Sequence, residues 1–249
     1  MSLPTLAIRV ISLPDSAERR AAVGEALAGL TLPWAFLDAC RGDSPSDLAE
    51  DPAAQRDCFG RVLTAGETGV FKSHMAVLAE FEADPALDWL LVLEDDVWID
   101  IAFPYAELAA FLDDKGIGFL RLFCREWKPA YPRYRFGERQ ILYLTSDPYG
   151  TQGYLISREA AARFRRHVTA ILRPIDDEFG RFWENGLDNH LLFPFPVLER
   201  HTPSTIEAGR AVSLREKRAD TMRRLGAKLS DYMAKRAYLA WRRSPLARD

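Results

Sequence analysis

The segment Asp88–Asp100 reads DWLLVLEDDVWID. Its core, Trp89–Leu93, is a short run of apolar residues, most of them large or β-branched. A run of this kind is typical of a strand that is buried on both faces, as in the centre of a parallel sheet. Three carboxylates, Glu94, Asp95 and Asp96, follow directly. The segment therefore predicts a central strand whose carboxyl end is strongly acidic.

Three adjacent carboxylates at the end of a buried strand repel one another, and desolvation worsens the repulsion. A bound cation would remove much of this cost. Mg²⁺ in proteins typically takes one or two carboxylates together with substrate phosphates. The acidic run therefore favours a metal–phosphate site at the end of the strand. A solvated acidic loop is the alternative.

Length and composition indicate one substantial core. The chain has 249 residues, of which 48% are hydrophobic, which fits one large domain or one domain with an appendage. The first ten residues lack the basic start and apolar segment of a signal peptide. No apolar run approaches the roughly 18 residues of a membrane-spanning helix. Three widely spaced cysteines match no zinc or disulfide pattern, so we expect reduced thiols in a cytoplasmic protein.

Charge divides the chain into an acidic body, residues 1–207 with net charge −11, and a basic tail, residues 208–249 with net charge +8. The tail reads as helical from Ser213. Its apolar residues recur at three- and four-residue spacing beside several Lys and Arg: Met222, Leu225, Leu229, Tyr232 and Met233. Such a basic amphipathic helix can lie on an anionic membrane surface or pack on the body. An anionic partner, membrane or nucleic acid, and a merely solvated helix are both open readings.

The amino-terminal part has the pattern of an α/β nucleotide-binding unit. A strand over 6–13 is followed by a helix over 17–30, capped by Asp15 or Ser16, and by a strand over 34–38. Ligands of such sheets bind beyond the carboxyl ends of the strands. Neither a Gly-x-Gly-x-x-Gly nor a Walker A sequence is present. Residues 41–60 read as a long irregular stretch.

The remaining elements alternate between helix and strand. Thr64 and Glu67 have the spacing of a capping box. The pattern therefore favours Glu67 as a helix cap over Glu67 as a catalytic base. His74 on the same helix reads more readily as a core histidine than as a ligand. We expect a helix to about Glu82, a helix over 105–112, a strand over 118–123, a hairpin over 133–144, a strand over 151–157, a helix over 158–172 and an extended segment over 191–198.

A second acidic cluster, Asp176, Asp177 and Glu178, lies just outside a regular element. A carboxylate positioned there can act as general base toward a hydroxyl acceptor. Exposed loop acids are the alternative.

Several segments, in this order, resemble glycosyltransferase family 25, which includes bacterial lipooligosaccharide galactosyltransferases and collagen-modifying galactosyltransferases. Together they span residues 8 to 206. The matching segments are Val10–Leu13 with Glu18–Arg20, Leu63–Gly69 with Ser73-His74, Leu91–Val97, Gly150–Ser157, Pro174–Asp177 and Pro196–Ile206.

The resemblance implies an α/β fold, a GT-A-like Rossmann-type mixed sheet flanked by helices, over residues 1–207, with the basic amphipathic helix over 208–249. It implies transfer of a hexose, galactose first, from a UDP-sugar to a saccharide acceptor of lipopolysaccharide or lipooligosaccharide, or to a lipid-linked glycan, with inversion. The implied cofactor is Mn²⁺, or Mg²⁺. Nucleic acid is not an expected partner, and the expected location is the cytoplasm, at the inner face of the membrane.

The resemblance also implies roles for single residues. Asp96 would be the main metal ligand, with Glu94 and His201, and Glu94 could instead face ribose. Asp177 would be the base, with Asp176 beside it and Glu67 in reserve, whereas Asp95 would point away and anchor the turn. The expected donor-binding residues are Val10, Ile11, Ser12 and Leu13 around uracil, Arg19 near the nucleotide, and His74 and Gln152 at the sugar.

The chain departs from the family pattern at several positions. Arg41 stands where an acid is common, Ala65 replaces a proline, Val70–Lys72 replaces small residues, and Thr205 replaces an Asp. These departures are compatible with a changed sugar specificity, or with a catalytically inactive glycan-binding or scaffolding protein. A metal-dependent phosphoryl- or nucleotidyltransferase is a third reading, and the lack of a phosphate-cradling glycine loop counts against it.

Overall fold

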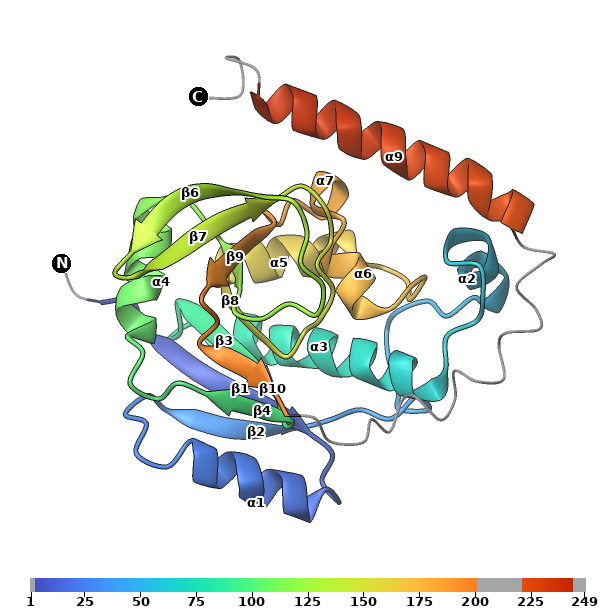
Figure 1. Ribbon diagram of the computed structural model, residues 1–249. Coiled ribbons are helices and arrows are strands. Elements are labelled where there is room, and N and C mark those ends of the chain that lie inside the picture. Colours follow the sequence, from blue (N-terminus) through green and yellow to red (C-terminus); the bar gives the residue numbers. More distant parts are fainter. Residues whose placement is uncertain (1–2, 201–220, 244–249) are drawn as a thin grey trace.

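The computed structural model describes residues 3–200 and 221–243 (Figure 1). Its main element is an eight-stranded mixed sheet in the order β2-β1-β3-β8-β5-β9-β7-β6. A second, two-stranded sheet pairs β4 (Val97–Ile99) with β10 (Val197–Glu199). The strands of the main sheet are β1 (Leu6–Ser12), β2 (Trp34–Asp38), β3 (Trp89–Glu94), β5 (Phe119–Arg121), β6 (Ala130–Phe136), β7 (Arg139–Leu144), β8 (Gly153–Ser157) and β9 (His190–Phe193).

Strand β3 is buried on both faces, as its apolar sequence predicts. Leu91 and Leu93 pack into one core, whereas Leu90 and Val92 pack into another. The first core includes residues of α1 (Ala17–Ala26) and α4 (Tyr105–Asp114). The second includes residues of α3 (Ala65–Ala83), α5 (Arg158–His167) and α6 (Ile175–Phe179). The predicted α/β fold, a mixed sheet between two layers of helices, is confirmed.

The neighbours of β3 differ in direction. Strand β1 is parallel to β3, but β8 is antiparallel to it, with Leu93 opposite Gly153. The sheet is therefore mixed at β3, as the resemblance implies, although the apolar run by itself is also typical of a parallel sheet. Because β8 begins where β3 ends, residues 151–152 meet Glu94, and the Glu94 N–H donates to the Gln152 carbonyl at 3.1 Å.

The segment 41–60 is not irregular throughout, because α2 (Pro52–Cys58) lies within it. The Asp51 side chain accepts from the Ala53 N–H at 2.8 Å and caps the helix. Pro52 occupies the first turn, where its missing N–H costs nothing. The prediction of an irregular stretch is therefore wrong over residues 52–58, because Pro52 begins a helix there.

Two helices end earlier than predicted. Helix α1 ends at Ala26 rather than residue 30, and Ser16 occupies its N-cap position without a side-chain hydrogen bond. Helix α5 ends at His167 rather than residue 172, since the chain turns extended at Val168. In the segment that follows α5, Ala170 forms an isolated parallel β-bridge with Ala49 in the loop before α2.

The predicted extended segment 191–198 divides between two strands, β9 and β10. Strand β9 pairs with β5 on one side and β7 on the other. Pro194 and Pro196 fall between β9 and β10, outside both strands. The missing proline N–H groups therefore interrupt no ladder.

The predicted helical tail is present as α9 (Thr221–Arg243), which contacts α2 and α7 (Phe182–Asn185) (Figure 1). The division between residues 207 and 208 lies outside the described residues. Within the described ranges, no helix combines the length and the apolar character needed to cross a bilayer.

Candidate active site

Glu94, the last residue of β3, has a fixed carboxylate. Its Oε1 accepts a hydrogen bond from the Thr151 hydroxyl and lies 3.8 Å from Nε2 of His74. Burial alone would raise the pKa of Glu94, but the contacts with His74 and Thr151 outweigh burial and lower the pKa. Glu94 is therefore held as a carboxylate at the end of the central strand.

His74 lies beneath Glu94 in the core. Its side chain is fully buried on α3. The Nδ1 atom lies 3.0 Å from the Tyr154 hydroxyl, and the ring packs edge-on against Phe179. Because its side chain is fully buried, His74 does not line a sugar site. It is the core histidine that the sequence favours, and its ring lies next to the Glu94 carboxylate.

Asp95 connects the acidic turn to the first strand. Its carboxylate accepts from the Ser12 hydroxyl at 2.7 Å and from an Arg19 N–H at 3.1 Å. The middle acid therefore anchors the turn, and it does so through two residues that the resemblance assigns to the nucleotide.

The end of β1 contributes less than expected to a uracil pocket. Val10 packs into the core under α1, and Ile11 packs into the core under α3. These two side chains are committed to the core, whereas Leu13 is only half-buried. A nucleotide at this edge would meet the β1 backbone and Leu13.

Asp96 lies beside a further acid that the sequence did not mark. Burial, followed by the charges of Glu94, Glu199 and Asp95, raises the pKa of Asp96 to about 7. Its buried Oδ1 has no hydrogen-bond partner among the described residues. Glu199 is close because β10 pairs with β4, and the Arg200 N–H donates to the Asp96 carbonyl at 2.6 Å. The only indication in the sequence that Glu199 belongs to the site is that the segment 196–206 resembles the family.

Gln152 and Arg125 hold Glu199 from the other side. Arg125 pairs with its carboxylate at 2.6 Å, and the Gln152 amide donates to it at 3.3 Å. The buried Oε1 of Gln152 has no partner in the described part of the chain. Gln152 therefore contacts the acidic edge through Glu199, and its expected place at the donor sugar stays a prediction.

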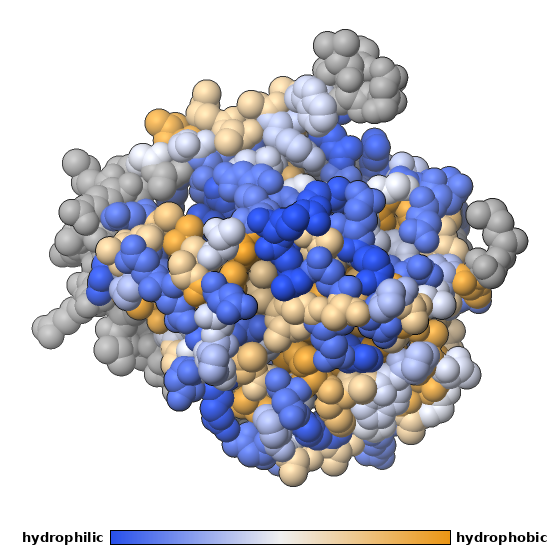
Figure 2. Space-filling view, turned by 180° about the vertical axis from the view of Figure 1, so that it is seen from behind, coloured by the Kyte–Doolittle hydropathy of each residue, from blue (hydrophilic) through white to orange (hydrophobic). Residues whose placement is uncertain are grey.

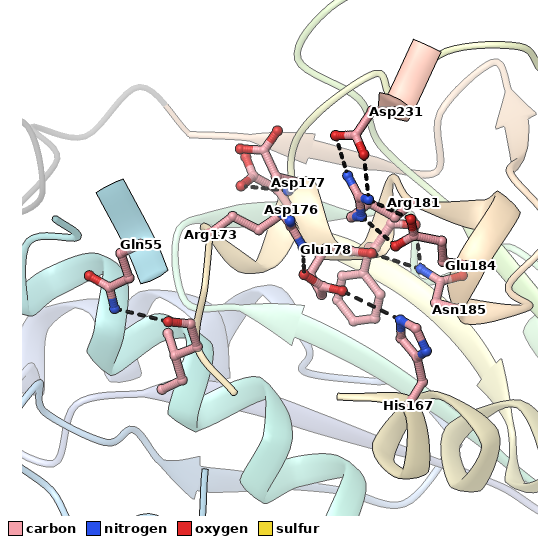
Figure 3. Close-up of polar contacts among 12 residues, drawn as sticks. Gln55, His167, Arg173, Asp176, Asp177, Glu178, Arg181, Glu184, Asn185 and Asp231 are labelled. Atoms are coloured by element: carbon pink, nitrogen blue, oxygen red, sulfur yellow. Dashed lines mark hydrogen bonds and ion pairs between the residues drawn. The ribbon is translucent and has the colours of Figure 1, made fainter. Parts of the chain in front are cut away.

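The second acidic cluster lies on α6 (Figure 3). Glu178 turns away from the other two acids and pairs with Arg173 at 2.7 Å. Asp177 has a pKa raised to about 7 by burial, then by the charges of Asp176 and Asp147. Asp177 therefore titrates near neutral pH, as a general base requires.

The two acidic clusters share one region of the protein. Burial alone would lower the pKa of Arg125, but Glu199, Glu94 and Asp176 raise it. Carboxylates of both clusters therefore lie close enough to Arg125 for their charges to act on its pKa. The arrangement therefore offers an acidic edge at the end of β3 and, on α6, a carboxyl group that titrates near neutral pH.

Glu67 has the contacts of a cap. Its carboxylate accepts two hydrogen bonds from Arg61, at 2.6 and 2.7 Å, and one from the Thr64 N–H at 3.0 Å. The predicted capping box is present. Burial would raise the pKa of Glu67, but these contacts lower it. Both oxygens are engaged, so the structure does not support Glu67 as a base.

The acidic edge fits a divalent cation only together with a ligand. Within residues 3–200 and 221–243, no three His, Cys, Asp or Glu side chains converge as a metal site. Asp96, whose Oδ1 has no partner in the described ranges, and the neighbouring Glu94 match the one or two carboxylates that Mg²⁺ takes beside phosphates. His201, the third expected ligand, lies outside the described residues, as does Thr205.

Two departures from the family pattern have structural roles. Arg41 pairs with Asp15 at 2.6 Å on the surface. Lys72 is buried and donates to the carbonyls of Gly42 and Ser44, both at 2.7 Å. Lys72 therefore fixes the loop after β2.

A family model described as "Glycosyltransferase family 25 (LPS biosynthesis protein)" matches residues 6–179. Among curated proteins, the lacto-N-neotetraose biosynthesis glycosyltransferase LgtE of Neisseria gonorrhoeae is 31% identical over 182 residues, covering 66% of this chain and 61% of the relative. The lipooligosaccharide biosynthesis protein lic2B of Haemophilus influenzae is 25% identical over 177 residues, covering 65% and 63%. The chain thus spans less than two thirds of the length of these relatives.

Solved structures give weaker likenesses. A glycosyltransferase involved in glycosylation of the major capsid of PBCV-1 has a TM-score of 0.32 at 14% identity, over 72% of this chain and 67% of that one. A197 from STIV has a TM-score of 0.35 at 13% identity, over 63% and 66%. The fold assignment rests on the sheet topology of this chain. The family match covers most of the body, and it shows that this protein belongs to glycosyltransferase family 25.

Proposed function

We propose that this protein transfers a hexose, galactose in the first instance, from a UDP-sugar to a saccharide acceptor of lipopolysaccharide or lipooligosaccharide. The proposal includes inversion at the anomeric carbon and dependence on a divalent cation, Mn²⁺ or Mg²⁺. The family membership supports glycosyl transfer. The names of the relatives LgtE and lic2B support the class of acceptor.

The observation that carries the proposal is the environment of the Asp96 carboxyl group. Its carboxyl is half-buried, lies among Glu94, Asp95 and Glu199, and has a pKa raised to about 7. Carboxylates held together in this way repel one another unless a positive charge joins them. Asp96 and Glu94 would hold the cation, which would neutralise negative charge on the departing diphosphate.

The chain's own residues supply the other requirements. Asp95, bonded to Ser12 and Arg19, holds the acidic turn against β1. Gln152 and Arg125 orient Glu199. A preorganised set of charges lowers the barrier because it needs no rearrangement during the reaction.

Asp177 is the proposed general base. In the transfer, the acceptor hydroxyl oxygen forms a bond to the anomeric carbon and the bond to the UDP oxygen breaks. The hydroxyl proton passes to the Asp177 carboxylate, and UDP leaves with the bonding electrons. A base with a pKa near 7 can accept this proton at neutral pH and release it again.

The test is incubation of the full chain with a panel of UDP-hexoses, Mn²⁺ and a lipooligosaccharide acceptor, followed by mass and NMR analysis of the glycan. We expect addition of one hexose with inverted anomeric configuration, and UDP as the other product. UMP or a sugar phosphate would instead indicate nucleotidyl or phosphoryl transfer. Failure to bind UDP with Mn²⁺ in calorimetry would favour the glycan-binding or scaffolding alternative.

A further inference from the structure

Helix α9 lies on the body through its polar face. Asp231 forms two hydrogen bonds with Arg181, each 2.7 Å long, and this pair is visible in Figure 3. Near the other end of the helix, Arg242 pairs with Asp188. Lys235 on the same face is half-buried. Ion pairs therefore attach this face of α9 to the body, together with Tyr238, whose ring packs edge-on against Phe182.

The opposite face of α9 is apolar and exposed. Leu229 is 63% exposed and Met233 60%, and Trp241 and Tyr232 are 56% and 52% exposed. With Arg236 between them, the exposed residues follow the three- and four-residue spacing of one helix face. The stripe consists of Leu229, Tyr232, Met233, Arg236, Ala237, Ala240 and Trp241.

This orientation is the reverse of that expected for a surface helix, which turns its apolar stripe to the core. Hydrophobic residues accordingly form part of the upper rim of the molecule in Figure 2, where α9 crosses it. Contiguous apolar surface of this kind marks a site of contact with another molecule or a membrane. Nothing among the described residues covers the stripe.

The charge of α9 indicates what covers it. Residues 221–243 contain seven Lys or Arg and one acid, Asp231, which Arg181 already neutralises. Lys228 and Arg236 are exposed beside the apolar residues. Basic residues around an apolar stripe that includes Trp and Tyr are the pattern of a helix lying in the interface of an anionic bilayer. The stripe is about 18 Å long from Leu229 to Trp241, at 1.5 Å per residue.

We propose that the Leu229–Trp241 face of α9 docks on an anionic phospholipid bilayer while its polar face stays attached to the body. The sequence left membrane contact and packing on the body as alternatives. The structure assigns one face to each. Arg181 lies four residues after Asp177, so its pair with Asp231 joins the docking helix to the segment that follows α6. If the proposed function holds, docking brings a lipid-linked acceptor close to Asp177.

The test is flotation of the full chain, at low salt, with large unilamellar vesicles. One set is pure phosphatidylcholine, and the other contains about 30 mol% phosphatidylglycerol. We expect binding only to the anionic vesicles. Leu229→Ser with Met233→Ser should weaken binding at least tenfold, because the apolar stripe no longer inserts. Ile101→Ser, which changes an exposed apolar residue near the start of α4, is the matched control and should bind as the parent does.

Circular dichroism and the melting temperature of each variant show whether it is folded. Undiminished vesicle binding by the folded Leu229→Ser/Met233→Ser variant would overturn the proposal. So would a lipid-free dimer, seen by analytical ultracentrifugation, that this variant disrupts, because a second copy would then cover the stripe. The measurement uses neither donor nor acceptor, so its failure leaves the proposed glycosyl transfer untouched.

Discussion

Glu199 and Asp96 lie side by side although 102 residues separate them, because β10 pairs antiparallel with β4 and places Glu199 opposite Val97. Glu199 raises the pKa of Asp96 through its charge. The pairing thus adds a carboxylate to an acidic edge that the sequence attributes to residues 94–96 alone. Its consequences can be measured.

Glu199→Gln should lower the turnover of UDP-hexose by about 10- to 100-fold, the usual effect of removing a residue that orients a metal-site ligand. The change removes one charge beside Asp96 and one partner of Arg125. The folded structure should survive, since the amide still accepts from Gln152. Glu126→Gln, an exposed acid that pairs with Lys128, is the control. Equal turnover in the two variants would exclude Glu199 from the site.

Asp96→Asn should abolish stabilisation by a divalent cation with UDP. In the parent protein, ligands at about 100 times their dissociation constant add about 2.7 kcal/mol to the free energy of unfolding. That corresponds to a rise of about 5–10 °C in melting temperature. EDTA should reverse the rise. A rise of the same size in Asp96→Asn would show that the cation binds elsewhere or is not needed.

Asp177→Asn should reduce turnover by about 10²- to 10⁴-fold, the usual contribution of a general base. In the parent protein, turnover should increase as the pH rises through about 7, because Asp177 must lose its proton to act. At saturating cation the bound positive charge would lower the pKa of Asp96 out of this range, so the variant should lack this step in its pH profile. Asp114→Asn, an exposed acid next to Lys115, should keep both the rate and the profile.

The same substitution should stabilise the fold at alkaline pH. Burial and the neighbouring Asp176 and Asp147 raise the pKa of Asp177 from 3.8 to about 7. A raised carboxyl pKa means that ionisation costs stability, so the penalty is absent below about pH 4, grows with pH and is complete above about pH 7. Asp177→Asn removes the penalty. Its melting temperature should exceed that of the parent at pH 8 but not at pH 4, and a lower value at pH 8 would contradict the interpretation.

Glu67→Gln should destabilise the fold and leave turnover within about threefold of the parent. The change weakens the hydrogen bonds from Arg61, which as bonds to a charged group are worth about 1.5–3 kcal/mol. Urea denaturation measures the loss. Thr64→Ala, which removes the other half of the capping box, should cost about 1 kcal/mol and also keep turnover. A loss of turnover in Glu67→Gln alone would restore Glu67 as a base candidate.

Local sequence determined much of the framework. The apolar run Trp89–Leu93 predicted a strand buried on both faces, and the spacing of Thr64 and Glu67 predicted the capping box. These features depend on neighbours a few residues away, so the chain order alone specifies them. Helix ends and α2 were harder to predict, because Pro52 breaks or begins a helix depending on whether the preceding residue caps it.

The environment of each acid depended on the tertiary structure. Glu94, Asp95 and Asp96 are adjacent in the sequence, yet Glu94 is paired with Thr151 and Asp95 with Ser12. One oxygen of Asp96 has no partner among residues 3–200 and 221–243. Strand directions decide this, since antiparallel β8 brings Thr151 to Glu94 and parallel β1 brings Ser12 to Asp95.

The amphipathic pattern of the tail likewise predicted a helix with an apolar face, but not which face meets the body. Packing decided that, because Arg181 and Asp188 on the body offer charged partners to Asp231 and Arg242. The sequence by itself therefore determined the elements and the residue types at the acidic edge. The pKa values and the orientation of α9 came from long-range pairing, since burial and charge contacts arise only when distant segments meet.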